Sequence, residues 1–127
     1  MPKIALIDFD GTVVDHKFPN IGEPMPEAFD VLKAMKRAGW KLILWTCRED
    51  CKKRKYLQEA VDFCKMNGVE FDAVNETIDQ HEFRDPEEYK YRRKPYARVC
   101  IDDSNLGGFP GWDVVRKEIL DDPRKHL

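Results

Sequence analysis

Two aspartates separated by one residue follow an apolar stretch near the start of the chain. Residues 3–7 form this stretch, and Asp8 and Asp10 come next, on either side of Phe9. Because strand side chains alternate, Asp8 and Asp10 are expected to point to one side of the chain. Two carboxylates this close repel each other unless a cation or a shared proton relieves them. A hard divalent cation with oxygen ligands meets this need, and Mg²⁺ is the expected one.

A glycine and a threonine come directly after these aspartates. Gly11 lets the backbone turn sharply, and the hydroxyl of Thr12 can tie the turn down. Taken alone, this block is also compatible with a strand that ends in a purely structural acidic turn. The functional interpretation therefore depends on what the later strands bring to the same place.

Two later stretches with strand character also end at polar residues. The apolar stretch 41–45 leads to Thr46, and the short stretch 98–101 leads to Asp102 and Asp103. In a sheet of parallel strands joined by right-handed crossovers, the carboxyl ends of the strands lie on one edge, where open α/β sheets bind ligands. These side chains are therefore expected to meet in one pocket.

In this order the residues resemble the four motifs of the haloacid dehalogenase (HAD) superfamily of phosphohydrolases. The first motif is the block 8–12, the second is Thr46, the third is Lys94, and the fourth is the pair Asp102 and Asp103. The resemblance implies an α/β, three-layer, Rossmann-like sandwich with a mainly parallel central sheet. It also implies the small capless class, because the intervals where larger members carry caps are used up by core elements.

The resemblance also implies a role for each motif. Asp8 would be the nucleophile that forms an aspartyl-phosphate, and Asp10 the general acid and base. Mg²⁺ would be held by Asp8, the backbone carbonyl of Asp10 and Asp103. Thr46 would hold a phosphate oxygen, and Lys94 would place a positive charge opposite the developing negative charge.

Three further residues are assigned to the surroundings of these groups. Asp102 is expected to position a neighbour rather than bind the metal directly, Arg48 to lie at the pocket mouth and read substrate charge, and Thr12 to support the first turn. Structural alternatives stay open at this point. Thr46 could cap a following helix, a basic neighbour could replace Lys94, and the Asp102–Asp103 pair could be a helix cap.

The rest of the chain alternates between strand-like and helix-like stretches, as expected for one domain over residues 1–127 with helices on both faces of a parallel sheet. Residues 13–26 are expected to be irregular, as a small hairpin flap above the site, and residues 75–97 to be either a functional loop or a plain insertion. One more strand is expected at 69–74. Helices are expected at 26–38, 49–67 and 112–120.

Composition excludes several classes of protein. The 22 basic and 24 acidic residues nearly balance, which argues against capture of nucleic acid or membrane by overall charge. No apolar run approaches the ~20 residues that span a bilayer, and the start of the chain lacks signal-peptide character. The prediction is a cytoplasmic protein with reduced thiols, in which Cys64 and Cys100 pack as small hydrophobes.

The predicted function is Mg²⁺-dependent hydrolysis of phosphate monoesters, with a small phosphorylated metabolite as the favoured substrate and a homo-oligomer as one way to cover the pocket. A phosphatase of nucleic-acid ends or of a phosphoprotein is an alternative, in which the basic run 52–55 and the residues Arg92, Arg93 and Lys94 would contact the nucleic acid. A receiver-like domain is a rival of another class, but receivers carry their acidic pair on the first strand and their phosphorylated aspartate later. A catalytically silent phosphate-binding module is the remaining alternative.

Overall fold

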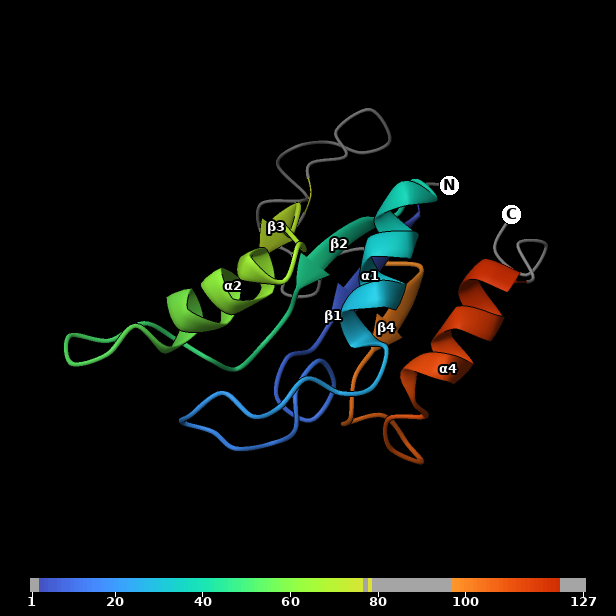
Figure 1. The fold of residues 1–127 in the computed structure, drawn as a ribbon. Coiled ribbons are helices and arrows are strands. Elements are labelled where there is room, and N and C mark those ends of the chain that lie inside the picture. The colour runs from blue at the N-terminus through green and yellow to red at the C-terminus, as the bar shows by residue number, and fades with distance from the viewer. Residues whose placement is uncertain (1–2, 77, 79–96, 122–127) are drawn as a thin grey trace.

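Four parallel strands form the sheet at the centre of the protein (Figure 1). The computed structural model describes residues 3–76, 78 and 97–121. The strands are β1 (Ile4–Ile7), β2 (Lys41–Leu44), β3 (Ala73–Val74) and β4 (Val99–Ile101), in the order β3-β2-β1-β4. In register, Ala5 of β1 lies opposite Leu42 of β2 and Val99 of β4. This confirms the predicted parallel, Rossmann-like α/β arrangement.

Helices connect or follow these strands. They are α1 (Ala28–Arg37), α2 (Tyr56–Met66) and α4 (Trp112–Val115), which continues directly as the π-helix η1 (Arg116–Asp121). α1 ends before Gly39 and α2 before Gly68, which have φ angles of 93° and 89°. Glycine adopts this left-handed conformation without the steric cost of a Cβ, so both predicted helix ends are correct to within about two residues.

The two faces of the sheet are covered differently. One face carries Ala5, Ile7, Leu42 and Leu44, and it forms a large core with side chains of α1, α2, α4 and η1. The other face carries Ile4, Leu6, Ile43 and Ala73. Among the described residues, the side chains packed against this second face belong to Trp45, Ile78 and Ala97, none of which lies in a helix. The expected helices on both faces are thus seen on one face only in this part of the chain, and the three-layer sandwich stays a prediction.

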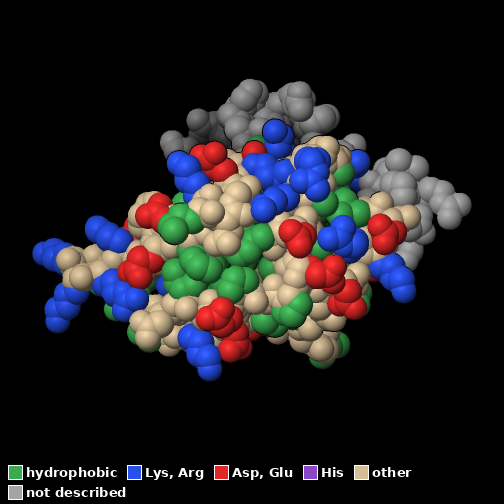
Figure 2. Space-filling model, viewed as in Figure 1, with side chains coloured by type: hydrophobic (Ala, Val, Ile, Leu, Met, Phe, Trp, Pro, Cys, Tyr) green, Lys and Arg blue, Asp and Glu red, His purple; other side chains and the backbone are tan. Residues whose placement is uncertain are grey.

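The start of α2 differs from the prediction. The sequence predicts a helix from residue 49, but α2 begins at Tyr56. Before it, the Cys51 N–H donates to the Arg54 carbonyl at 3.0 Å, which closes a tight turn with Lys52 and Lys53 at its tip. Asp50 accepts a hydrogen bond from the Gln58 N–H at 3.0 Å and so caps the first turn of α2 from outside the helix. The basic run therefore lies on a projecting turn rather than on a helix face (Figure 2).

Residues 13–26, called the flap below, form the small hairpin that the sequence predicts. The Asp15 N–H donates to the Glu23 carbonyl and the Met25 N–H to the Val13 carbonyl, both at 2.8 Å. Between these paired ends, residues 16–20 are exposed. The flap thus has an anchored base and a solvent-facing tip.

One of the two cysteine predictions is wrong. Cys64 on α2 is fully buried in the main core, as predicted, whereas Cys100 on β4 is exposed. Cys100 lies opposite Leu6, on the face of the sheet over which the described residues place no helix. Each helix within residues 3–76, 78 and 97–121 is too short or too polar to cross a membrane.

Candidate active site

Three carboxylates meet beyond the carboxyl ends of β1 and β4. Asp8, Asp102 and Asp103 each offer one oxygen atom, and these atoms all lie within 4.8 Å of one another. They meet because β1 and β4 are parallel neighbours that end together, with the Asp8 N–H donating to the Ile101 carbonyl at 3.0 Å. Within residues 3–76, 78 and 97–121, this is the one such group of three metal-binding side chains. Asp102, expected to lie behind the metal ligands, is therefore a candidate ligand itself.

Gly11 makes room for this cluster. Its φ angle is 83°, and a Cβ added at this position would collide with the side-chain carboxylate of Asp103. A side chain here would be strained and would also displace Asp103 from Asp8. The glycine of the first block is thus required by the approach of the last strand, in addition to the local turn.

The cluster changes the ionisation of Asp8. Burial, the negative charge of Asp102 and a hydrogen bond with Asp103 raise the pKa of Asp8 to about 7, although the Thr12 hydroxyl opposes this by donating to Asp8 at 3.1 Å. Three acidic groups at this distance cannot all stay ionised unless a cation compensates them. The donor set therefore fits a hard divalent cation, which takes carboxylate oxygens as ligands.

Thr12 holds Asp8 from behind. Its side chain is fully buried, so it does not reach the open pocket. Its carbonyl accepts a 2.7 Å hydrogen bond from the indole N–H of Trp112, the first residue of α4. Thr12 is therefore a support for Asp8 that also joins the first loop to the last helix.

Thr46 follows β2 and faces the same pocket. Its hydroxyl accepts a hydrogen bond from the Arg48 N–H at 3.2 Å, and its own N–H donates to the Asn75 side chain at 2.8 Å. Thr46 does not cap α2, which begins at Tyr56. Asn75 is not among the residues expected at the site, yet it directly follows β3, so the strand-end rule that identifies Thr46 applies to Asn75 as well.

Arg48 differs most from the expectation. Instead of lying exposed at the pocket mouth, it is 2% exposed, and its guanidinium binds the Asp10 carboxylate through two hydrogen bonds of 2.7 and 2.8 Å. A guanidinium whose donors are all directed inward cannot read the charge of an incoming substrate. Arg48 holds the Asp10 carboxylate, and it affects a molecule in the pocket only through Asp10.

These groups line an open pocket of about 460 Å³. We call it the acidic pocket. Its walls include Asp8, Asp10, Thr46, Arg48 and Asp103, all anticipated from the sequence. Lys94, the predicted source of positive charge, lies outside the described residues. Further lining residues come from the flap, the loop after β2 and the loop after β4: His16, Phe18, Cys47 and Ser104.

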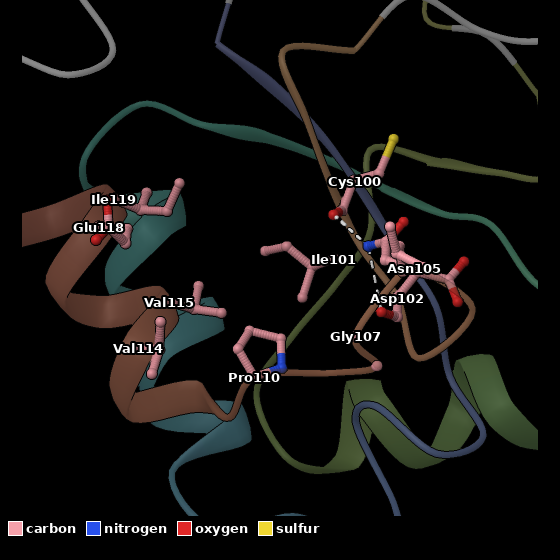
Figure 3. Close-up of a pocket in the computed structure, with 12 residues that line it drawn as sticks. Cys100, Ile101, Asp102, Asn105, Gly107, Pro110, Val114, Val115, Glu118 and Ile119 are labelled. Atoms are coloured by element: carbon pink, nitrogen blue, oxygen red, sulfur yellow. Dashed lines mark hydrogen bonds between the residues drawn. The ribbon is translucent and has the colours of Figure 1, made fainter.

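A second hollow, of about 400 Å³, lies between β4 and the helix formed by α4 and η1 (Figure 3). We call it the apolar hollow. In Figure 3, Val115 and Ile119 extend from the helix towards the side where Ile101 lies on β4. On the loop side, the Asn105 amide donates to the carbonyls of Cys100 and Asp102, both at 3.3 Å. The apolar hollow thus combines a largely apolar wall with a polar loop whose Asn105 amide is hydrogen-bonded within the same segment.

Comparison with known proteins identifies a structural relative. No protein-family model matches the sequence, and no curated protein matches it. Among solved structures, a conserved protein of Bacteroides thetaiotaomicron is 36% identical to this chain, with a TM-score of 0.78. The match covers 95% of this chain and 92% of the Bacteroides chain, so the similarity extends over most of both proteins.

Proposed function

The chain belongs to the same family as this conserved Bacteroides protein, and from the chemistry of its acidic pocket we propose that it is a Mg²⁺-dependent phosphohydrolase of the HAD type. The observation that carries the proposal is the group formed by Asp8, Asp102 and Asp103, whose oxygen atoms lie within 4.8 Å of one another. Such a group is costly for a protein to keep without a cation. Its position beyond parallel strand ends is where this fold class binds ligands.

Mg²⁺ would be held by Asp8 and Asp103, with Asp102 as a third carboxylate beside them. When bound, the ion would supply positive charge that lets an anionic phosphate approach the carboxylates. The clustering itself supports this assignment. Burial and the neighbouring carboxylates raise the pKa of Asp8 to about 7, and a bound cation would counteract this rise by favouring the ionised carboxylate.

The protein's own residues would then divide the reaction between them. A carboxylate oxygen of Asp8 attacks phosphorus, the bond to the ester oxygen breaks, and Asp10 gives that oxygen a proton. In the second half, water attacks the phosphorus of the aspartyl-phosphate while Asp10 takes up a proton from it, which releases phosphate and restores Asp8. The Thr46 hydroxyl, in the same pocket, is suited to hold a non-bridging oxygen in both steps.

A small phosphorylated metabolite is the favoured substrate. A pocket of about 460 Å³ is within the usual size range for sites that bind small molecules. One observation favours the alternative of a polyanion such as a nucleic-acid end: Lys52, Lys53 and Lys55 are exposed on the projecting turn before α2. An open pocket is compatible with either substrate.

The test is release of inorganic phosphate from 4-nitrophenyl phosphate by the purified protein. Turnover should require Mg²⁺, stop with a chelator, and fall by about 10³-fold or more in Asp8→Asn. Retention of a tenth of the activity in that variant would contradict the assignment of Asp8. Incubation with acetyl phosphate distinguishes the rival class, because a receiver accumulates phosphoprotein whereas a phosphatase consumes the donor. A screen of phosphorylated metabolites and oligonucleotides would then choose between the two substrate classes.

A further inference from the structure

The guanidinium of Arg48 is the most completely bonded polar group beside the acidic pocket. An arginine offers five N–H donors. In Arg48, Nε and Nη2 donate to the two carboxylate oxygens of Asp10, and Nη2 also donates to the Asn20 carbonyl at 3.0 Å. The two N–H groups of Nη1 donate to the carbonyls of Pro19 and Tyr56, at 3.5 and 3.2 Å. Every donor therefore has a partner.

These partners belong to three separate segments. Asp10 follows β1, Pro19 and Asn20 form the tip of the flap, and Tyr56 is the first residue of α2. Two aromatic rings add to the arrangement: the guanidinium carbon lies 5.1 Å from the ring centres of both Phe9 and Phe18. Phe9 is in the core and Phe18 is on the flap, so the flap holds the guanidinium through backbone and side-chain contacts together.

From this geometry we propose that Arg48 is a positioning residue, which fixes the direction of the Asp10 carboxylate and holds the flap tip beside the pocket. The part that concerns Asp10 rests on the proposed function. The part that concerns the flap is a property of the fold and does not depend on any activity.

The chemical consequence concerns the proton that Asp10 transfers. A carboxylate has about four lone-pair positions, and Arg48 takes one on each oxygen. The side chain of Asp10 is only 12% exposed, so a small part of it faces the pocket. A two-point hydrogen bond stops the carboxylate from rotating and leaves its remaining lone pairs in one fixed direction. Lysine cannot reproduce such a bond, because its ammonium is a single point of charge.

A second arginine on the same loop provides a matched control. Arg54 also makes a two-point ion pair, to Glu59 at 2.8 and 2.9 Å, and it also contacts the flap, through the Asn20 side chain at 3.4 Å. It differs in lying partly exposed and in making no hydrogen bond to Asp10. A comparison of Arg48→Lys with Arg54→Lys therefore isolates the contact with Asp10 and the buried carbonyls.

The first experiment compares two substrates with different leaving groups. An alkyl phosphate needs a proton on its leaving oxygen, whereas 4-nitrophenolate leaves without one, so formation of the aspartyl-phosphate depends strongly on Asp10 only for the alkyl ester. Because kcat/KM reports this first half-reaction, we expect Arg48→Lys to lower kcat/KM for an alkyl phosphate by about 10²-fold or more and for 4-nitrophenyl phosphate by less than about tenfold. Arg54→Lys should stay within about threefold of the wild type on both. An equal loss on both substrates, or no loss, would overturn the role at Asp10.

The second experiment follows the flap without any substrate. Hydrogen exchange of the Asp15 and Met25 amides, which close the base of the flap, should be about tenfold faster in Arg48→Lys than in Arg54→Lys. Equal exchange in the two variants would overturn the role at the flap. A wild-type protein without turnover would contradict the proposed phosphatase function, while the exchange result would still decide the role at the flap.

A third variant keeps the inference testable if Arg48→Lys does not fold. Phe18→Ala removes one of the two rings from the guanidinium but leaves every hydrogen bond of Arg48 in place, and the ring it removes is 49% exposed. Its Asp15 and Met25 amides should exchange about threefold faster than those of the wild type. Unchanged exchange would overturn the inference.

Discussion

The acidic pocket and the apolar hollow have similar volumes, about 460 and 400 Å³, but only one of them gathers reactive groups. Asp102 belongs to both regions: it lines the apolar hollow and forms a cluster with Asp8 and Asp103. On the side of the acidic pocket, side chains converge from the ends of β1, β2 and β4. On the other side, helix and strand side chains pack against one another. The convergence of strand ends, rather than cavity volume, therefore distinguishes the candidate active site from the apolar hollow.

The largest expected effect separates the proposed metal ligands from ordinary surface acids. Asp103→Asn should lower kcat/KM with Mg²⁺ by about 10²-fold or more, because it removes a carboxylate from the cluster. Asp102→Asn should cost less, about tenfold. The exposed Asp113 at the start of α4 is a matched control, and Asp113→Asn should leave kcat/KM within about twofold. If Asp102→Asn were the more damaging change, Asp102 would be the main ligand in place of Asp103.

A second prediction concerns a substitution in the apolar hollow, which should change stability and leave activity unchanged. Ile119 is 7% exposed and belongs to the main core, so Ile119→Ala should lower the free energy of unfolding by about 2 kcal/mol. Because Ile119 does not line the acidic pocket, kcat per folded molecule should not change. Urea denaturation measures the stability, with Val114→Ala as the control, since Val114 is 38% exposed. A parallel loss of kcat would show that the two regions are energetically coupled.

A third prediction concerns the stability cost of the acidic cluster itself. The pKa of Asp8 rises from 3.8 to about 7 on folding, so folding favours its protonated form. Stability should therefore fall as pH rises through this window in the absence of divalent cations. The asparagine of an Asp8→Asn variant cannot ionise. After allowance for solvent screening, we expect this variant to be about 1 kcal/mol more stable to unfolding than the wild type at pH 8, and equally stable at pH 4. Equal stability of the two proteins at both pH values would contradict the electrostatic account.

The smallest expected effect compares a thiol of the acidic pocket with a thiol outside it. Cys47 lines the acidic pocket, whereas Cys100 lies on β4 on the sheet face over which the described residues place no helix, and both are exposed. Phosphate with Mg²⁺ should slow alkylation of Cys47 a few-fold and leave Cys100 unchanged. Cys64 should stay unmodified in the folded protein, because its thiol is buried and burial raises its pKa to about 12. Mass spectrometry of tryptic peptides resolves the three sites, and protection of Cys100 would mean that phosphate binds elsewhere.

The sequence predicts the strands and the residues that follow them because short apolar stretches, strand ends and glycine stops are local signals, but it overextends β3, which covers only Ala73–Val74 of the predicted 69–74. It places Asp8, Asp103 and Thr46 at one edge without any distance information. It misplaces the start of α2 because the basic residues 52–55 have helix-compatible composition, while the turn that excludes them depends on the Cys51–Arg54 hydrogen bond.

The burial of Arg48 could not be predicted in the same way. An arginine in the loop after a strand, two residues beyond Thr46, is normally exposed, and the burial of Arg48 depends on Phe18, Pro19 and Asn20, which are about 30 positions earlier in the chain. No periodicity in either segment indicates that they meet. Asp102 illustrates the same limit, since its distance from Asp8 follows from the exact register of β1 and β4.

The hydrogen bond from Trp112 to Thr12 has a consequence for the order in which the protein matures. It joins residues 100 positions apart, and Thr12 in turn holds Asp8. During synthesis, a chain that has not yet reached β4 can pair β1 with β2 but has neither Asp102 and Asp103 nor Trp112 to complete the acidic cluster. Contacts between residues so far apart in the sequence form late in folding, because the chain loses the entropy of a large loop before these contacts add any stability. The acidic cluster and its support from Trp112 are therefore completed only after β4 and the start of α4 have been made.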